Sequence, residues 1–266
     1  PTNGHAFKMQ TVPGYIDSMT DFYVTDAGLG ITETTIAGFV GYDVKGIPEF
    51  IRARKATQYA NNIDQWVKLV NEGNNGGYAN IWLLCNINTG EIARYEQGLK
   101  HQELLESTDG FYYGWNACHN PRIRNLECVD NGYNDTRQQT GARRARFEEL
   151  LPEVSGTIDD GVAKRILADK YDPYLGYQCA SSRNICAHYD VDPQYYADDP
   201  HGVWNVPFFP GGSCDGKCAD ATDIKNLNMW GIFGRADGEP FDAKDFMKQH
   251  PEWNWQKGYL YDRPSQ

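Results

Sequence analysis

Two short runs of β-branched and aromatic residues near the start of the chain, separated by a turn, constrain its fold more than any other feature. Residues 22–24 read Phe-Tyr-Val and residues 29–32 read Leu-Gly-Ile-Thr, whereas residues 26–28 read Asp-Ala-Gly. The runs favour strands and the residues between them favour a turn, so we predict a β-hairpin. Its second strand continues to Thr34 and Thr35, whose side chains point to opposite faces because strand side chains alternate. At most one of these hydroxyls can therefore face a given cleft.

A helix packed on a sheet is predicted for the next part of the chain. From Phe50 to Val70, apolar residues recur at three- and four-residue spacing, which indicates one amphipathic helix. Residues 78–95 read as a hairpin with a turn at residues 88–90, and residues 79–85 are apolar enough for a strand buried on both faces. Strand pairs that alternate with amphipathic helices indicate a layered α+β fold.

The elements of the second half are less regular. Residues 110–117 read as a strand whose aromatic part is residues 111–115 and which carries Asn116 at its end. Pro152 separates two predicted helices, and a third, short helix precedes Pro251. The three helices are predicted at residues 142–151, 157–171 and 242–250.

The charge and hydropathy of the chain exclude two classes of partner. The formal net charge is −11 over 266 residues, whereas nucleic-acid phosphates demand clustered Lys and Arg. The basic cluster at residues 143–146 is too short to change this conclusion. No apolar run approaches the roughly 18 residues that a membrane span needs. We therefore predict a globular protein that binds no nucleic acid and has no membrane span.

Six of the seven cysteines fall into local pairs, which indicates disulfides across short loops and an oxidising compartment. The pairs are Cys118 with Cys128, Cys179 with Cys186, and Cys214 with Cys218, and Cys85 is left over. A zinc site is the alternative, because the last pair nearly has zinc-ligand spacing, although the other two do not. Asn134 begins an N-glycosylation sequon in a polar loop. Together these features predict a secreted, lysosomal or vacuolar glycoprotein.

Two acidic groups leave metal binding open as a further alternative. His188, Asp190 and Asp192 alternate onto one face of an extended segment and could bind a hard cation. Asp215, Asp220 and Asp223 resemble calcium ligands, but they lack the EF-hand spacing and its terminal Glu. Such runs are more often solvated strand edges or loops. We predict that the protein holds no metal and no cofactor.

Several short motifs occur in an order that is typical of one superfamily. They are Pro13-Gly14, Asp21-Phe22-Tyr23, Gly28-Leu29 and Glu33-Thr34-Thr35, followed by residues 77–84, residues 114–116 and the late run of residues 215–243. In this order the chain resembles the N-terminal-nucleophile (Ntn) hydrolases of the penicillin acyltransferase type and the phospholipase B-like proteins. The resemblance extends over nearly the whole chain.

The resemblance implies a fold and a nucleophile. The fold would be the four-layer αββα sandwich of Ntn hydrolases without its first strands, formed as a single domain by residues 1–266. In such enzymes the thiol of an N-terminal Cys attacks the acyl carbon, while its own α-amine accepts the proton. Pro1 offers no thiol, and the sequence has no initiator Met or signal peptide. We therefore expect a large subunit or fragment, with the Cys supplied by a missing N-terminal segment or a small partner chain.

The resemblance also suggests site residues. Thr35 matches the position where related choloylglycine hydrolases place an Asn, so its hydroxyl could donate to the developing oxyanion, and Asn116 resembles the second oxyanion residue. The alternatives are a polar strand end for Thr35 and an ordinary turn residue for Asn116. Arg143 or Arg144 matches a buried family Arg or lies on a solvated helix face. His119 could line the substrate cleft or merely cover the loop.

Two functions follow from this reading. The first is an amide- or ester-cleaving hydrolase or acyltransferase that acts through an acyl-thioester on a small acyl-amide or lipid-like substrate. The second is a non-catalytic secreted glycoprotein that uses the same fold for binding or structure. The sequence leaves open the acyl group, the leaving group and whether the protein forms a homo-oligomer.

Overall fold

The chain divides into two compact units in the computed structural model, which describes residues 3–18, 20–179, 181–186, 215–249 and 251–265. Unit 1 comprises residues 1–133, 153–157 and 219–230. Unit 2 comprises residues 134–152, 158–218 and 231–266. The predicted disulfide between Cys214 and Cys218 and the acidic group at residues 188–192 involve positions outside the described residues.

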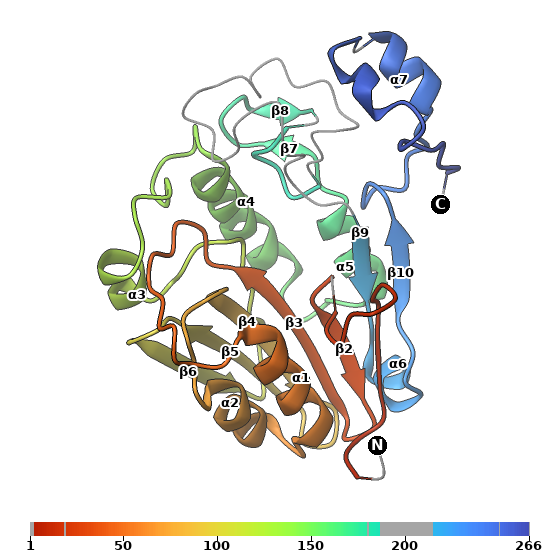
Figure 1. The fold of residues 1–266 in the computed structure, drawn as a ribbon. Helices are drawn as coiled ribbons and strands as arrows, with labels where there is room; N and C mark the ends of the chain where they lie inside the picture. Colours follow the sequence, from red (N-terminus) through yellow and green to blue (C-terminus); the bar gives the residue numbers. More distant parts are fainter. Residues whose placement is uncertain (1–2, 19, 180, 187–214, 250, 266) are drawn as a thin grey trace. The chain divides into compact units, whose positions relative to one another are not determined.

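Unit 1 is built on a six-stranded antiparallel sheet in which strands that are neighbours in sequence are neighbours in space (Figure 1). The strands are β1 (Phe7–Met9), β2 (Phe22–Thr25), β3 (Leu29–Thr35), β4 (Asn80–Asn86), β5 (Glu91–Gln97) and β6 (Gln102–Ser107). The hairpins predicted at residues 22–32 and 78–95 are confirmed as β2–β3 and β4–β5. β6 was not predicted, because its sequence, Gln-Glu-Leu-Leu-Glu-Ser, lacks the β-branched residues that mark a strand.

Two helices take the place of the single helix predicted over residues 50–70, so that prediction is wrong. They are α1 (Glu49–Tyr59) and α2 (Ile63–Asn71). Between them the backbone is extended at Ala60, and Asn62 caps α2 by accepting a hydrogen bond from the Gln65 N–H at 2.9 Å. Asn favours such caps because its side chain competes with the helical backbone for hydrogen bonds. An apolar repeat can therefore continue across a helix break.

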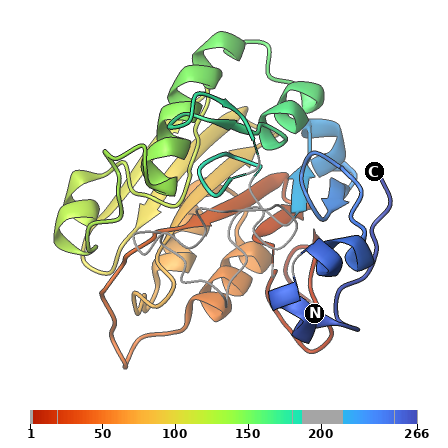
Figure 2. The same cartoon turned by 90° about the horizontal axis from the view of Figure 1, so that it is seen from above.

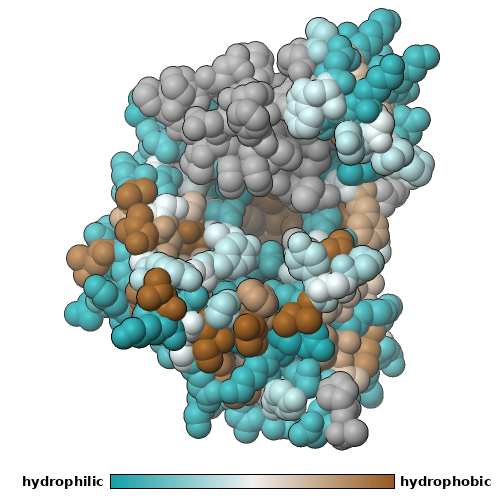
Figure 3. All heavy atoms as spheres, viewed as in Figure 1, coloured by the Kyte–Doolittle hydropathy of each residue, from teal (hydrophilic) through white to brown (hydrophobic). Residues whose placement is uncertain are grey.

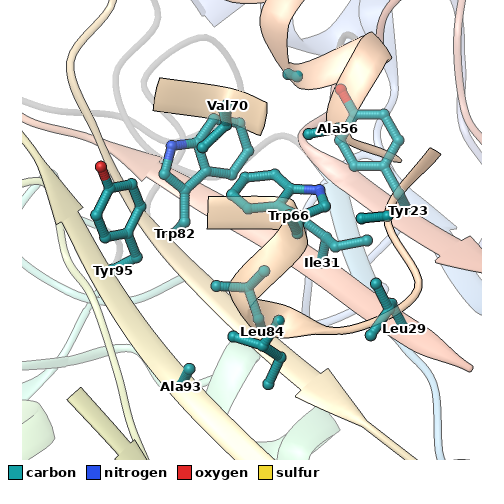
Figure 4. Close-up of a cluster of buried hydrophobic side chains, with 13 residues drawn as sticks. Tyr23, Leu29, Ile31, Ala56, Trp66, Val70, Trp82, Leu84, Ala93 and Tyr95 are labelled. Carbon is teal, nitrogen blue, oxygen red and sulfur yellow. The ribbon is translucent and has the colours of Figure 1, made fainter. Parts of the chain in front are cut away.

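β4 is buried on both faces, as its sequence predicted. Trp82 and Leu84 belong to a large apolar cluster with residues of β2, β3, α1 and α2, where the rings of Trp66 and Trp82 meet edge to face at 4.8 Å (Figure 4). α1 and α2 cover this face of the sheet (Figures 1 and 2). Ile81 and Leu83 point to the opposite face, where they pack in a second cluster.

The second apolar cluster holds an irregular segment against the sheet. It joins Ile36 and Ile81 to Cys118 and to Ile123 of α3 (Pro121–Leu126). The strand predicted at residues 110–117 is absent, so that prediction is wrong. A Cβ atom at Gly114 would lie 2.3 Å from the Thr34 Cγ2 atom. The backbone thus packs directly on a side chain of β3 instead of pairing with a neighbouring strand.

Unit 2 contains helices and short strands. They include α4 (Gln139–Val154), α5 (Asp160–Leu167), β7 (Tyr171–Asp172), β8 (Tyr177–Gln178), β9 (Asp215–Cys218), α7 (Ala243–Gln249) and the 3-10 helix η1 (Pro251–Gln256). β9 pairs with β10 (Trp230–Phe233), which begins at the boundary between the units, and α6 (Ala221–Lys225) belongs to unit 1. The predicted short helix before Pro251 is confirmed as α7.

Pro152 does not divide the helices of unit 2 as predicted. It lies inside the last turn of α4, two residues before the helix ends at Val154. A proline near a C-terminus still removes a hydrogen bond, but few turns remain for it to disrupt. α5 is shorter than predicted, and it begins after Asp159, which caps it by accepting from the Val162 N–H at 2.8 Å.

Helices and antiparallel sheets therefore occur together in the described chain. The four-layer αββα arrangement and the single domain over residues 1–266 stay predictions. No helix in the described ranges has both the length and the apolar composition to cross a bilayer.

We expect Leu29→Ala to lower the free energy of unfolding by about 3–5 kcal/mol, because Leu29 is fully buried in the large apolar cluster and its truncation leaves a cavity. Leu126→Ala is the matched control, since Leu126 is 66 % exposed in the same unit and should change stability by less than about 0.5 kcal/mol. Urea unfolding followed by tryptophan fluorescence measures both, and equal effects would contradict the assignment of the core.

Candidate functional site

Strained backbone gathers at the end of β3. Four described non-glycine residues have positive φ, and three of them, Asp21, Tyr78 and Asn116, with φ of 53°, 62° and 71°, bond to residues 33–35. This conformation is uncommon for residues with a Cβ atom, and such strain is often found at functional sites. The end of β3 is therefore the candidate functional site.

Asn116 is fixed by hydrogen bonds to the two threonines of β3. Its backbone N–H donates to the Thr34 Oγ1 atom at 2.9 Å, and its side-chain amide donates to the Thr35 carbonyl at 3.0 Å. The Asn116 carbonyl in turn accepts from the Ala37 N–H at 3.0 Å. The structure thus brings together Thr35 and Asn116, the two residues that the sequence analysis singled out. The hydroxyl that binds Asn116 directly, however, is that of Thr34.

Thr35 points to the opposite face of the strand, together with Glu33. The Tyr78 hydroxyl donates to Glu33 Oε1 at 2.9 Å, and the Thr35 side chain hydrogen-bonds the same hydroxyl. Asn80, which pairs with Thr35 across the sheet, donates its amide to Glu33 Oε2 at 2.9 Å when its side chain is oriented to satisfy its neighbours. The Thr35 hydroxyl is therefore engaged in a polar network. Its role as an oxyanion donor stays a prediction.

Four carboxyl groups meet beside this network. They belong to Asp17, Asp21, Glu33 and Glu49, and Glu33 shares a hydrogen bond with the Asp21 carboxyl. Burial, and then the proximity of Asp21, raises the pKa of Glu33 well above its usual range. Burial, followed by repulsion from Asp17, raises the pKa of Glu49 to about 8. We name these residues the carboxyl cluster.

Burial also raises the pKa of Asp17, whose carboxylate accepts a hydrogen bond from the Tyr23 hydroxyl. Arg52, which is 2 % exposed, opposes the shift at Glu49, but it also donates to the backbone carbonyls of Ile47 and Val70. Perturbed carboxyl groups of this kind concentrate at functional sites. The sequence motifs contained Asp21 and Glu33, whereas Asp17 and Glu49 were missed because only the fold brings their separate elements together.

His119 lies three residues after Asn116 and packs among aromatic rings. Its ring contacts Trp115 at 4.4 Å and Tyr113 at 5.1 Å, both edge to face. The buried Glu96 carboxylate accepts from the His119 N–H at 3.0 Å and from the Asn120 N–H at 2.7 Å. Glu96 in turn pairs with Arg94 at 3.2 Å. The sheet therefore fixes the backbone of residues 116–120, and His119 is part of that packed segment.

Arg143 and Arg144 belong to α4 in unit 2, whereas Thr35 and Asn116 belong to unit 1. The Arg143 Nε atom donates to the Gln139 carbonyl at 3.4 Å, and Arg144 forms an ion pair with Glu148 at 2.8 Å along the helix. Their assignment to substrate binding stays a prediction.

The structure describes both cysteines of two of the predicted disulfide pairs. Cys118 and Cys128 are thiols in this structure, and their sulfur atoms share a hydrogen bond. The Cys179 and Cys186 N–H groups donate to the adjacent carbonyls of Lys170 and Asp169, at 2.9 and 3.0 Å. Cys85 is a free thiol whose pKa is raised by burial, which makes it unreactive. The disulfides stay predictions.

The acidic group of Asp215, Asp220 and Asp223 makes other contacts in the structure. Within the described ranges, no three His, Cys, Asp or Glu side chains are arranged to hold a metal ion. Asp220 and Asp223 form a reciprocal capping box at the start of α6, and Asp215 pairs with Lys217 at 2.6 Å. Asn134, the first residue of the glycosylation sequon, is exposed.

Comparison with known proteins identifies the family. The family model described as phospholipase B matches residues 1–265. The chain belongs to the phospholipase B family. It is 26 % identical over 260 residues to human phospholipase B-like 1, covering 88 % of this chain and 44 % of that protein. It is 22 % identical over 253 residues to phospholipase B of Crotalus adamanteus, covering 85 % and 42 % of the two chains.

A shorter match of higher identity occurs with phospholipase B-like protein G of Dictyostelium discoideum, which is 40 % identical over 78 residues, or 27 % of this chain and 13 % of that protein. The chain thus spans less than half the length of these relatives. The phospholipase B part of the resemblance noted in the sequence is confirmed. Membership of the Ntn superfamily stays a prediction.

The carboxyl cluster predicts a pH dependence of stability. A carboxyl group with a raised pKa in the folded state binds its proton more tightly there, so its contribution falls as pH rises above the unfolded value of about 4.5. For Glu49 this window extends to about pH 8. We expect Glu49→Gln to become more stable relative to the wild type across this window, by up to about 1.4 kcal/mol per pH unit.

Urea unfolding at a series of pH values measures this difference. Glu153→Gln is the control, because Glu153 is exposed near the end of α4, and its substitution should leave the pH profile unchanged. Parallel profiles for the wild type and Glu49→Gln would contradict the buried, proton-binding state of Glu49.

Proposed function

We propose that the protein is a hydrolase or acyltransferase of the Ntn type, which cleaves an ester or amide bond in a lipid-like or N-acyl substrate. Membership of the phospholipase B family supports an acyl-cleaving function. The observation that carries the proposal is the geometry of Asn116, whose strained backbone and three hydrogen bonds fix an amide at the end of β3.

In the proposed reaction, an N-terminal Cys thiol from outside residues 1–266 attacks the acyl carbon, and its α-amine takes the thiol proton. The tetrahedral intermediate carries a negative oxygen, which the Asn116 amide stabilises by donating a hydrogen bond. The amine then returns the proton to the leaving group as the acyl-thioester forms. Water, or an acceptor amine or alcohol, releases the acyl group in a second attack.

The carboxyl cluster and its hydroxyls have a positioning role in this proposal. Tyr78 donates to Glu33, and Thr35 hydrogen-bonds Tyr78, so the protonation state of Glu33 determines how firmly Thr35 is oriented. A neutral Glu33 also removes one negative charge from the buried cluster of carboxyl groups. The network would therefore work best when its carboxyls hold protons.

Exposed apolar residues support a lipid-like substrate over a small polar one. Val40, Tyr42 and Val44 are exposed in the segment that follows β3, and the Tyr42 ring packs against Gly77, next to Tyr78. Apolar side chains also gather on the face of unit 1 drawn in Figure 3. Such a surface suits an acyl chain beside the proposed site.

A secreted or lysosomal location is part of the proposal. The paired cysteines, the exposed sequon at Asn134 and a carboxyl cluster that favours bound protons all suit an oxidising or acidic compartment. No cofactor or nucleic acid takes part in this mechanism. A small partner chain that carries the Cys is its main requirement.

N-terminal sequencing and intact-mass analysis of the native protein test the nucleophile. We expect a segment that begins with Cys, whose alkylation by iodoacetamide abolishes hydrolysis of an acyl reporter ester. If no Cys-initiated segment accompanies these residues, the proposed mechanism is wrong, and a non-catalytic binding glycoprotein becomes the better account.

Substitution of Asn116 in the full-length protein tests the oxyanion site. Asn116→Asp keeps the size of the side chain and tolerates positive φ, but it removes the amide donor, so we expect kcat to fall about 10²- to 10³-fold. Asn116→Gly, which relieves the strain, should be equally impaired. Asn254→Asp, at an exposed position of η1, is the matched control. Unchanged kcat in both Asn116 variants would contradict the assignment.

A further inference from the structure

Cys118 and Cys128 lie on, or pair with, the two segments that flank the end of β3. Cys118 is fully buried two residues after Asn116. Cys128 forms an isolated antiparallel bridge with Phe39, on the segment that continues from β3. On either side of Cys128, the Val129 N–H donates to the Gly38 carbonyl at 2.8 Å and the Val40 N–H donates to the Glu127 carbonyl at 2.9 Å. A bond between the two sulfurs would close this connection covalently.

The residue before Cys128 is anchored independently. The Glu127 carboxylate accepts hydrogen bonds from the backbone N–H groups of Leu99, Lys100 and His101, at 2.8, 3.0 and 2.8 Å. Arg124 donates to the carbonyls of Cys118 and His119, at 2.8 and 2.9 Å. Both ends of the loop that carries α3 are therefore held by groups other than the cysteines, whether or not the cysteines are bonded to each other.

The two thiols differ in reactivity. The hydrogen bond between the two side chains, and then burial, raise the pKa of Cys118, whereas the same hydrogen bond lowers the pKa of Cys128. Cys128 is partly exposed, whereas Cys118 is buried. Cys128 is thus the thiol that reacts first with an oxidant, and Cys118 lies in position to complete the bond.

We propose that Cys118 and Cys128 form a redox-sensitive disulfide staple that locks the segment carrying Asn116 onto the end of β3. The thiolate of Cys128 attacks a small disulfide, such as oxidised glutathione, forms a mixed disulfide and releases one glutathione thiolate. Cys118 then loses its proton and attacks the Cys128 sulfur, which expels the second glutathione. Two protein thiols are oxidised to one disulfide, and one oxidised glutathione is reduced to two thiols.

The disulfide staple restrains the residues around Asn116, whose strained backbone can open locally. Asn116 is held at positive φ by single hydrogen bonds to Thr34, Thr35 and Ala37, and these bonds can open locally. A covalent link two residues away lowers the freedom of the open state, so it favours the closed one. The effect of the staple on local opening of the backbone does not require catalytic activity, whereas its effect on turnover rests on the proposed function.

Peptide mapping and hydrogen exchange test the staple on the full-length protein. After equilibration with oxidised glutathione, we expect a non-reduced digest to contain a cross-linked peptide pair that joins Cys118 to Cys128. Reduction should then speed amide exchange at residues 37 and 116–120 by about tenfold. Cys128→Ser should exchange at the rate of the reduced wild type and lose its response to reduction.

Two controls separate this staple from the other cysteines. Cys85→Ser should behave as the wild type, because Cys85 is a free thiol on β4. If exchange at residues 116–120 of Cys128→Ser still responds to reduction, the effect belongs to other cysteines and the proposal is wrong. Full alkylation of Cys118 and Cys128 after treatment with oxidised glutathione, or exchange at residues 116–120 that ignores reduction, would overturn the proposal.

Turnover of an acyl reporter ester distinguishes the staple from the proposed function. If both redox forms are inactive while exchange still responds to reduction, the proposed function fails and the staple stands. If the oxidised form is active and Cys128→Ser has a lower kcat, both stand.

Discussion

The alternation of side chains along the last residues of β3 is the constraint on which the candidate site depends. Thr34 faces the segment of Gly114 and Asn116, whereas Glu33 and Thr35 face Tyr78 and the carboxyl cluster. A shift of one residue in the register of β3 would exchange these two sets. The pairing of β3 with β4 over seven residues, from Leu29 opposite Asn86 to Thr35 opposite Asn80, prevents such a shift. The register of the sheet thus determines which polar side chains lie on each of its faces.

The two faces also differ in how their polar groups are satisfied. On the Asn116 face, backbone groups and neutral side chains bond each other at ordinary distances, and the buried Glu96 is balanced by Arg94. On the other face, carboxyls face one another with Arg52 as the buried cation beside Glu49. Burying like charges is costly unless protons are bound. The carboxyl cluster therefore forms a dense polar network that lowers the stability of the fold near neutral pH.

Local signals in the sequence were sufficient for the sheet but not for the site. The hairpins β2–β3 and β4–β5 follow from strand composition and turn residues, and β4 was recognised as buried on both faces. The helix break at Asn62 was missed because an amphipathic repeat has the same spacing on both sides of a cap. The strand predicted before Asn116 was wrong because Gly114 packs directly on the Thr34 side chain and the rings of Tyr113 and Trp115 stack on each other. Asp17 and Glu49 carry no motif, so only tertiary structure could reveal them.

The close approach of Gly114 to Thr34 has a use in reading other sequences. A Cβ atom at this position would lie within 2.3 Å of a Thr34 methyl group, so even alanine requires the segment to move. Asn116 follows two residues later at positive φ, where Asn, Asp or Gly is favoured. A chain that keeps the Glu-Thr-Thr motif but has a larger residue in place of Gly114 must have a different backbone conformation in this segment. Glycine and asparagine at this spacing thus form a compact signature for ranking uncharacterised sequences by whether they can share the same local geometry.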